Sequence, residues 1–354
     1  MNRVRIEAGK PYDVLIGAGL LDRAGELCRE VTDAGAAALV TDDNVDALYA
    51  QQTRRALERA GFRVEKFVFE AGEHSKSFRT LERLLGFLAR RGFTRSDLVV
   101  ALGGGVTGDL AGFAASCYLR GVRYVQIPTT LLAAVDSSVG GKTAIDIEEG
   151  KNLVGAFYQP ARVILDTNCF DTLPRPVYLD GVSESVKYGV ICDRALFDKI
   201  ASGGFQGETG LIVERCVRIK GEIVAADEFD RGRRQLLNLG HTVGHAMEKL
   251  SGFSVSHGQA VSAGMAVFMR AARARGLCPP DAAARMLRAL DALGLKTHCP
   301  YGAEELYQAA LSDKKRQGGS ITLAVPCDVG DTRLMTLPVE ELRGFIRDGL
   351  EAEQ

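Results

Sequence analysis

Three of the five histidines in this chain, His241, His245 and His257, lie close together. Neutral imidazole is the commonest metal ligand, and histidine titrates nearest to physiological pH, so this group could bind a metal, transfer protons or do both. His241 and His245 are four residues apart, so in a helix both rings would leave the same face. The spacing predicts a divalent metal site, with an ordinary pair of helix-surface histidines as the alternative.

A run of glycines follows an apolar segment and precedes a candidate helix, at Gly103, Gly104 and Gly105. Backbone without Cβ atoms can approach a phosphate closely, and amides at a helix start favour a pyrophosphate. The spacing is not G-x-G-x-x-G, so a plain tight turn is the alternative. Asp42 ends another candidate strand and could bind ribose hydroxyls or cap the next helix.

A second polar segment covers residues 128–143 and continues at 150–152. Small hydroxyl and glycine residues alternate there with Lys142, Lys151 and Asn152, which can bind anionic oxygens. The segment predicts an anion pocket. A glycine-rich loop with solvated lysines is the alternative.

Further along the chain, Glu184 and Lys187 lie three residues apart, a spacing that is most often an exposed helical ion pair. Arg234 and Asn238 precede His241 by seven and three residues, so in one continuous helix all three would share a face. Such a face is too polar for a core and predicts a binding surface.

Two regions must position these residues. Short apolar runs predict strands at 12–16, 37–41, 63–69, 98–102, 124–128 and 162–166, and helical periodicity predicts helices at 21–32, 45–60, 77–90 and 106–116. After the prolines at 174 and 176 the pattern predicts helices at 182–201, 210–227, 234–251, 259–275, 280–293 and 303–311, with a hairpin at 320–338. We expect an α/β domain over 1–173 and a mainly helical domain over 174–354.

Composition excludes several classes of function. Forty-four basic against 45 acidic residues leave a net charge of -1 without a basic block, so neither nucleic acid nor a membrane is an expected partner. The eight cysteines form no C-x-x-C pair and read as reduced thiols. No signal peptide or membrane-spanning run is expected, which favours the cytoplasm.

Together these segments resemble the 3-dehydroquinate synthase family of sugar-phosphate cyclases. The motifs that carry the resemblance are GGGV at 103–106 with GD at 108–109, PTT at 128–130 through Lys142, GKN at 150–152, Glu184 with Lys187, LNLGH at 237–241 with His245, and HG at 257–258. The resemblance implies a Rossmann-like nucleotide-binding domain followed by a helical domain that binds metal and substrate.

The resemblance also implies bound NAD and one divalent metal, zinc or cobalt, held by Glu184, His241 and His257. One carboxylate with two imidazoles is a recognised catalytic zinc set. His245 would then handle protons and contact the anion. Catalytic roles are implied for His245, Lys187, Asp230 and Arg234.

The resemblance assigns two larger sets of contacts. The NAD contacts are Asp42, Asn44, Glu73, Lys76, Gly104, Gly105, Val106, Asp109, Thr129, Thr130, Lys151 and Thr172. The substrate contacts are Arg120, Asp136, Lys142, Asn152, Lys187, Lys220, Arg234, Asn238 and Lys314, with Lys315 as the alternative to Lys314. Arg120 would reach the phosphate site of a neighbouring subunit, which implies a homodimer.

The implied reaction converts 3-deoxy-D-arabino-heptulosonate 7-phosphate into 3-dehydroquinate and phosphate. It proceeds through transient oxidation by NAD, phosphate elimination, re-reduction and an intramolecular aldol closure, and the substrate's own phosphate can serve as base. Two positions depart from the family: Asp230 stands where a glutamate is common, and Asp180 stands where an asparagine is usual.

Three other functions remain open. A sister cyclase would make an amino-dehydroquinate, a deoxy-inosose or a valiolone, although Lys142 together with Arg234 favours a substrate that carries a carboxylate. A metal-dependent polyol dehydrogenase would share the glycine turn and release NADH. A binding protein without activity is the third alternative.

Overall fold

The computed structural model describes residues 1–311, 316–317 and 319–353 and divides into two compact units. The first unit contains Met1–Leu173 and Val217–Phe229, and the second contains Pro174–Cys216 and Asp230–Gln354. The expected boundary at residue 174 therefore assigns one segment, Val217–Phe229, to the wrong unit. Glu228 explains part of that grouping, because its carboxylate accepts hydrogen bonds from Gln159 Nε2 at 2.8 Å and from the Gly9 amide at 2.8 Å.

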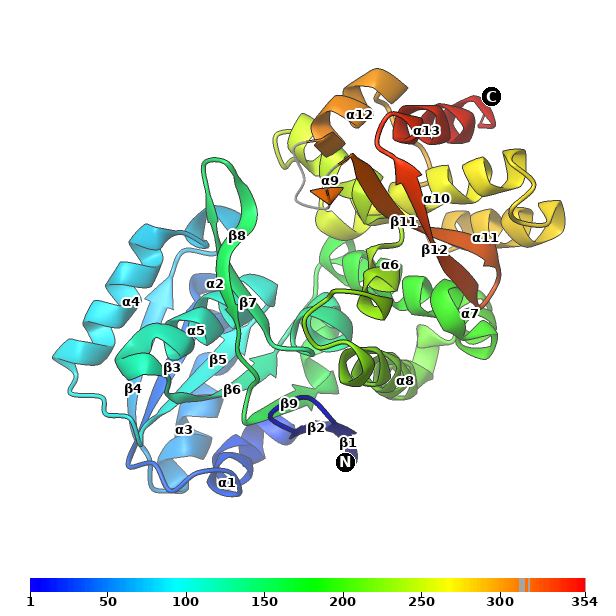
Figure 1. Cartoon of the computed structure of the whole chain (residues 1–354). Helices are drawn as coiled ribbons and strands as arrows, with labels where there is room; N and C mark the ends of the chain where they lie inside the picture. Colours follow the sequence, from blue (N-terminus) through cyan, green and yellow to red (C-terminus); the bar gives the residue numbers. More distant parts are fainter. Residues whose placement is uncertain (312–315, 318, 354) are drawn as a thin grey trace. The chain divides into compact units, whose positions relative to one another are not determined.

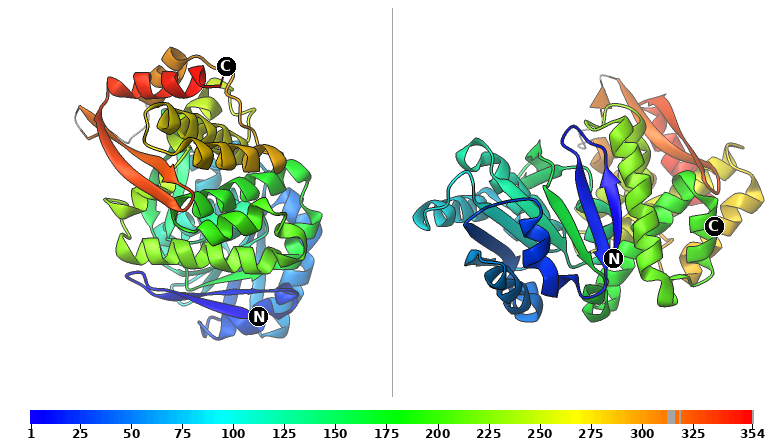
Figure 2. Two further views of the ribbon diagram at one scale, coloured as in Figure 1. Left: turned by 90° about the vertical axis from the view of Figure 1, so that its right-hand side faces the viewer. Right: turned by 90° about the horizontal axis from the view of Figure 1, so that it is seen from below.

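A seven-stranded sheet forms the centre of the first unit, in the order β1-β2-β9-β6-β5-β3-β4. Six of its strands run parallel, and only β1 is antiparallel to its neighbour. The strands are β1 (Asn2–Ile6), β2 (Tyr12–Gly17), β3 (Ala36–Asp42), β4 (Arg63–Phe69), β5 (Leu98–Gly103), β6 (Arg123–Pro128) and β9 (Arg162–Asp166). Figure 2 shows β1 and β2 as a dark-blue hairpin. All six predicted strands are present, and β1 was missed.

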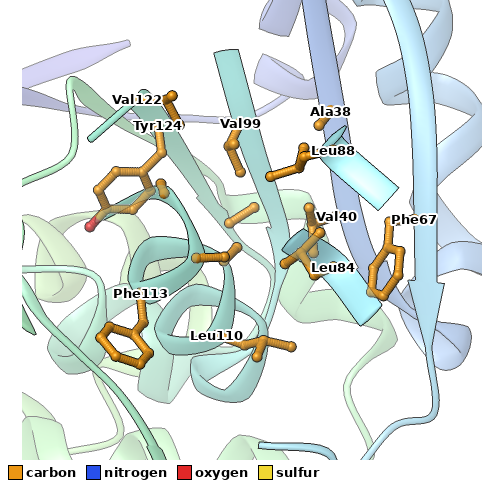
Figure 3. Packing of buried hydrophobic residues seen from close by; sticks show 14 of the residues in the cluster. Ala38, Val40, Phe67, Leu84, Leu88, Val99, Leu110, Phe113, Val122 and Tyr124 are labelled. Atoms are coloured by element: carbon orange, nitrogen blue, oxygen red, sulfur yellow. The ribbon is translucent and has the colours of Figure 1, made fainter. Parts of the chain in front are cut away.

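Helices cover the sheet of the first unit. They are α1 (Ala24–Arg29), α2 (Asp43–Val45), α3 (Gln51–Arg59), α4 (Phe78–Arg90) and α5 (Gly105–Cys117). Leu84 and Leu88 of α4 and Leu110 of α5 pack with Val40 and Val99 of the sheet, as Figure 3 shows. Successive strand residues point to opposite faces, so the continuous apolar strands are buried on both sides.

A separate antiparallel pair, β7 (Lys142–Ile147) and β8 (Gly150–Phe157), includes Lys142, Lys151 and Asn152 of the predicted anion pocket, in a segment where the sequence predicted no strand. Gly155 permits this pairing, because a Cβ there would lie 2.1 Å from the Thr143 carbonyl oxygen. Neither strand was predicted, because glycine and charged residues before and between the two strands interrupt the apolar pattern. Figure 1 shows the pair as a green hairpin.

The second unit is mostly helical (Figure 1). Its helices are α6 (Arg175–Cys192), α7 (Arg194–Ala201), the start of α8 (Phe205–Ala226), α9 (His241–Leu250), α10 (His257–Ala274), α11 (Pro280–Ala292), α12 (Ala303–Leu311) and α13 (Glu341–Glu351). The strands β10 (Arg316–Gln317), β11 (Ser320–Asp328) and β12 (Asp331–Pro338) form a small sheet. The predicted fold class, a parallel α/β domain followed by a helical domain, is confirmed. Within the described residues, no helix is long and apolar enough to cross a bilayer.

Two predicted helices are divided in the structure. The 182–201 segment breaks at Asp193, whose side chain caps α7 by accepting from the Leu196 amide. The 234–251 segment breaks at Gly240, which has φ 80° and separates a 3₁₀ turn, Arg233–Asn238, from α9. A left-handed glycine ends helical continuity, so the prediction that Arg234, Asn238 and His241 share one helix face is wrong.

Helix α10 is the centre of the second unit and packs against α6, α9, α11 and α13. Its contact with α9 depends on glycine, because a Cβ on Gly264 would lie 2.0 Å from the Gly240 carbonyl oxygen. Backbone at that distance cannot move aside without shifting a helix.

We predict that Gly264→Ala lowers the free energy of unfolding by about 1–3 kcal/mol, because the added methyl forces α9 and α10 apart. The matched control is Gly344→Ala in α13, where the new methyl would lie 3.4 Å from the flexible end of Arg275. Alanine is the better helix former, so this control should gain about 0.5–1 kcal/mol. Urea unfolding midpoints of the two variants compare them directly. Equal midpoints would contradict the close packing.

Candidate functional site

Three helices of the second unit bring together the residues assigned to the metal. Glu184 from α6, His241 from α9 and His257 from α10 each offer a ligand atom, and these atoms all lie within 4.8 Å of one another. His241 Nε2 is 3.7 Å and His257 Nε2 is 3.4 Å from Glu184 Oε1. Glu184 is 0% exposed, so its carboxylate faces protein on every side. The donor set suits a divalent metal such as zinc.

The other ring nitrogens of the two histidines have partners that orient them. His241 Nδ1 lies 3.1 Å from the Leu239 carbonyl oxygen, and His257 Nδ1 lies 3.1 Å from Glu248 Oε2. Each ring therefore turns its Nε2 toward Glu184. Metal-binding histidines typically make such contacts through the nitrogen that does not bind the metal.

Electrostatics at His257 favour a positive charge. Burial lowers the pKa of His257, but hydrogen bonds and charges from Glu184 and Glu248 outweigh that effect and raise the pKa to about 10. A divalent cation next to Glu184 would also be favoured by this negative charge, so the residues fit a metal.

His245 lies beside this set. Its ring centroid is 5.3 Å from that of His241 and 6.0 Å from that of His257. It groups instead with Glu248 and His257, in a second set of possible ligand atoms. The simple helical pair of His241 and His245 is therefore not the set that contains Glu184.

Lys187 completes the polar centre of α6. Its side chain is 1% exposed, and its ammonium forms an ion pair with Glu184, one turn away in the same helix. The 184/187 spacing thus corresponds to a buried ion pair, not to the exposed pair that such a spacing usually gives. A buried lysine needs a close carboxylate to keep its charge.

Arg234 is also buried, with 2% of its surface exposed. It belongs to the 3₁₀ turn before Gly240, together with Asn238, and this turn contacts α6, β11 and β12. Asp230, a few residues earlier, has φ 59°. Aspartate tolerates this left-handed conformation better than most residues.

A cluster of charges in the first unit contains several of the residues assigned to NAD. Lys76, 4% exposed, lies 2.6 Å from Asp109 Oδ2 and 3.7 Å from Glu73 Oε1, and it donates to Asn152 Oδ1. Lys151 lies 3.7 Å from the same Glu73 oxygen. Burial lowers the pKa of Lys76, but Asp109 and Glu73 outweigh it and raise that pKa. Asn152, assigned to substrate, thus lies with the NAD set.

The glycine turn begins α5 without a side-chain cap, since Gly104 is its N-cap. Cβ atoms on Gly104 and Gly105 would lie 3.2 Å from Thr130 Cγ2 and from Ser137 Oγ, so larger residues would fill this space. Uncapped helix amides beside small residues fit a pyrophosphate. Val106 lies in the first turn of the same helix.

The remaining residues assigned to NAD lie elsewhere in the first unit. Asp42 caps α2 by accepting from the Val45 amide at 3.0 Å and accepts from Thr107 Oγ1 at 3.2 Å, which supports its interpretation as a helix cap. Asn44 is exposed in α2, and Thr129 is buried. Thr172 Oγ1 lies 2.5 Å from the hydroxyl of Tyr49.

The substrate set is spread over both units. Lys220 donates to the Asp136 carboxylate at 2.8 Å within the first unit. Lys142 and Arg120 are exposed there, and Arg120 has φ 66° in a turn that ends at Gly121. Lys314 and Lys315 lie outside the described residues.

Comparison with known proteins identifies the family. Residues 66–179 match the family model described as 3-dehydroquinate synthase N-terminal, and residues 181–316 match the one described as 3-dehydroquinate synthase C-terminal. The chain is 41% identical over 351 residues to a 3-dehydroquinate synthase of Enterococcus faecalis, covering 96% of each chain. The chain belongs to the 3-dehydroquinate synthase family.

Solved structures of other enzymes have the same fold. A 2-deoxy-scyllo-inosose synthase complexed with carbaglucose-6-phosphate, NAD+ and Co2+ has a TM-score of 0.88 at 24% identity, covering 99% of this chain and 100% of that one. A 2-epi-5-epi-valiolone synthase from Streptomyces hygroscopicus with NAD+ and Zn2+ bound has a TM-score of 0.87 at 26% identity, covering 96% and 97%. Both share the fold, at lower identity than the 3-dehydroquinate synthase relative.

Asp180, one departure from the family, supports the start of α10. Its carboxylate accepts from Ser256 Oγ at 2.6 Å and from the backbone amides of Gly258 and Gln259. Ser256, the N-cap residue, makes no side-chain capping bond itself. Burial raises the pKa of Asp180, and these hydrogen bonds offset part of that rise. Asp180 therefore caps α10 from another helix.

Glu248 is the residue that the sequence analysis missed. It follows His241 by seven residues and His245 by three, so α9 presents all three on one face. That periodicity was readable in the sequence. The sequence did not show that His257, from another helix, would lie in contact with Glu248.

We predict that Asp180→Ala lowers the free energy of unfolding by about 1–2 kcal/mol, because the first amides of α10 lose their cap. Asp180→Asn is the matched control. It keeps one amide oxygen as acceptor and removes a buried charge, so it should stay within about 0.5 kcal/mol of wild type. Urea unfolding of the metal-free protein measures both. An alanine variant as stable as the asparagine variant would show that Asp180 does not cap the helix.

Proposed function

We propose that this protein catalyses the conversion of 3-deoxy-D-arabino-heptulosonate 7-phosphate into 3-dehydroquinate and phosphate. The observation that carries the proposal is the near-full-length similarity to a 3-dehydroquinate synthase, at 41% identity. Glu184, His241 and His257 support the proposal, because their possible ligand atoms lie within 4.8 Å of one another although the residues are far apart in the sequence.

NAD and a divalent metal, zinc or cobalt, fit the residues of the two units. When bound, NAD would accept and return a hydride and the metal would act as a Lewis acid toward substrate oxygens. Glu184, His241 and His257 would hold the metal. The glycine turn at Gly104 and Gly105 would hold the pyrophosphate of NAD.

Lys187 supplies a fixed positive charge next to the ligand set. Its ammonium lies in the protein interior against Glu184, where solvent does not screen it. A positive charge there lowers the pKa of a substrate hydroxyl held nearby, so Lys187 would favour loss of the hydroxyl proton. This role requires a charged Lys187, and a carboxylate in contact with an ammonium favours its charged form.

His245 is suited to proton transfer. It lies against His241 and His257, outside the set that contains Glu184, and histidine is the side chain most often used as a general acid or base. Phosphate elimination requires removal of a carbon-bound proton while phosphate leaves with the bonding electrons. The substrate's own phosphate can take that proton, with His245 exchanging it at the phosphate oxygen.

Arg234 would bind the carboxylate of the substrate. A buried guanidinium can hold a carboxylate through two parallel hydrogen bonds. The substrate of 3-dehydroquinate synthase carries this group. Asn238 follows in the same 3₁₀ turn and would donate to the same ligand.

We also propose that the enzyme is a homodimer in the cytoplasm. The dimer rests on Arg120, which is exposed at the end of a left-handed turn and matches a family arginine that reaches a neighbouring subunit. The compartment rests on the eight cysteines, all of which lie within the described residues as free thiols.

Incubation of the protein with the heptulosonate phosphate, NAD and zinc should release phosphate without net accumulation of NADH, because the hydride is returned within one turnover. Phosphate release and NADH absorbance are followed together. Glucose 6-phosphate, which has no carboxylate, is the control and should release little phosphate. Net NADH formation from a polyol, or no phosphate from the heptulosonate, would contradict the proposal.

We predict that His257→Ala loses both bound metal and activity, whereas His245→Ala keeps its metal and loses about 100-fold or more in kcat. The first variant removes a ligand, and the second removes a proton carrier. Metal content of the purified proteins and their kcat values separate the roles. Metal retained by His257→Ala would refute the ligand assignment.

A further inference from the structure

The proposed reaction gives no role to Glu248, a buried carboxylate beside the metal-ligand set. The side chain is 3% exposed, in the third turn of α9, and its Oε2 lies 3.1 Å from His257 Nδ1. A buried carboxylate is costly unless it is paired. Its position on the helix is also restrained, since the Glu248 carbonyl oxygen accepts from the Phe253 amide at 2.8 Å and from Ser251 Oγ at 2.9 Å.

The two nitrogens of His257 face different carboxylates. Nδ1 faces Glu248, and Nε2 lies 3.4 Å from Glu184 Oε1. Neutral imidazole carries one proton, so the nitrogen that donates decides which nitrogen has a lone pair for a metal. Both carboxylates accept hydrogen bonds and neither donates. Because Glu184 is itself taken as a metal ligand, only Glu248 is left to accept the proton of a metal-bound His257, and that proton is then on Nδ1.

We propose that Glu248 is a positioning residue that holds the His257 ring with its proton on Nδ1 and its Nε2 lone pair aimed at the metal site. This inference rests on the proposed function, because it takes Glu184, His241 and His257 as the ligands. The inference concerns which nitrogen of His257 binds the metal and how firmly the His257 ring is held.

His241 provides an internal comparison. Its Nδ1 lies 3.1 Å from the Leu239 carbonyl oxygen, which also accepts a hydrogen bond and cannot donate one. Both histidines therefore follow one rule, with Nδ1 held by a neighbouring acceptor and Nε2 turned to Glu184. For His241 the acceptor is backbone next to its own helix. For His257 it comes from another helix, so a side chain must supply it.

One other arrangement of the same atoms must be distinguished. Glu248 also groups with His245 and His257 as a possible ligand set. A ligand and a positioning residue respond differently to substitution, because loss of a ligand removes a bond to the metal. Loss of an orienting carboxylate typically weakens metal binding about 10–100-fold.

The test measures zinc affinity by competition with a chelator, in the full-length protein without substrate. We compare wild type with Glu248→Gln, Glu248→Met and Glu184→Gln. Glutamine keeps an acceptor oxygen for Nδ1–H, whereas methionine has a similar length and no such acceptor. Glu351→Met, on the exposed face of α13, controls for the loss of one negative charge.

Glu248→Met should bind zinc about 10–100-fold more weakly than wild type, Glu248→Gln within about fivefold and Glu351→Met unchanged, whereas Glu184→Gln should lose most bound zinc. In zinc-loaded protein with 15N-labelled histidine, wild type and Glu248→Gln should show a His257 Nδ1–H that exchanges slowly with water, and in Glu248→Met that proton should exchange faster, because no acceptor holds it. A change in folding alone would not produce this pattern, and thermal unfolding of each variant is recorded beside it.

Three results would overturn the proposal. If Glu248→Met binds zinc as tightly as wild type does, Glu248 has no positioning role, although Glu184, His241 and His257 can still be the ligands. Equal loss in Glu248→Met and Glu184→Gln would make Glu248 a ligand. Zinc retained by Glu184→Gln would refute the ligand set, and with it the site on which the proposed function depends.

Discussion

The second unit is organised around one buried carboxylate. Glu184 lies in the middle of α6 with no solvent exposure, and moving a carboxylate out of water costs several kcal/mol unless positive charge surrounds it. Lys187 supplies charge from the same helix, and the Nε2 atoms of His241 and His257 approach from two other helices, where they would hold a divalent cation against the carboxylate. The need to compensate this one charge therefore constrains three helices at once.

Glycine allows those helices to come close enough. A Cβ on Gly258 would lie 2.2 Å from Asp180 Cα, and one on Gly264 would lie 2.0 Å from the Gly240 carbonyl oxygen, so α10 touches both α6 and α9 through backbone. His257 and His241 are the first residues of α10 and α9. Distances between ligand atoms are thus determined by helix contacts that admit no side chain.

The sequence predicted the parts whose signal is local. Strands such as β5 are short continuous apolar runs, and helical periodicity after residue 173 predicted helices in the part of the chain where the structure has them. The β7–β8 pair was missed because its pairing depends on Gly155 meeting Thr143, a contact that no periodicity shows. The prediction of one continuous helix through Gly240 was wrong for a related reason. A single left-handed residue breaks a pattern that otherwise continues through it.

The site was predictable in its residue types and not in its geometry. Resemblance to a family placed Glu184 with His241 and His257, although spacing alone favoured His241 with His245. Glu248 illustrates the limit: its spacing from His241 put it on the histidine face of α9, but its contact with His257 exists only because α10 begins beside it. Pairwise contacts between helices follow from packing, and packing here depends on glycines whose importance a single sequence does not reveal. A ligand set can therefore be inferred from sequence sooner than the residues that orient it.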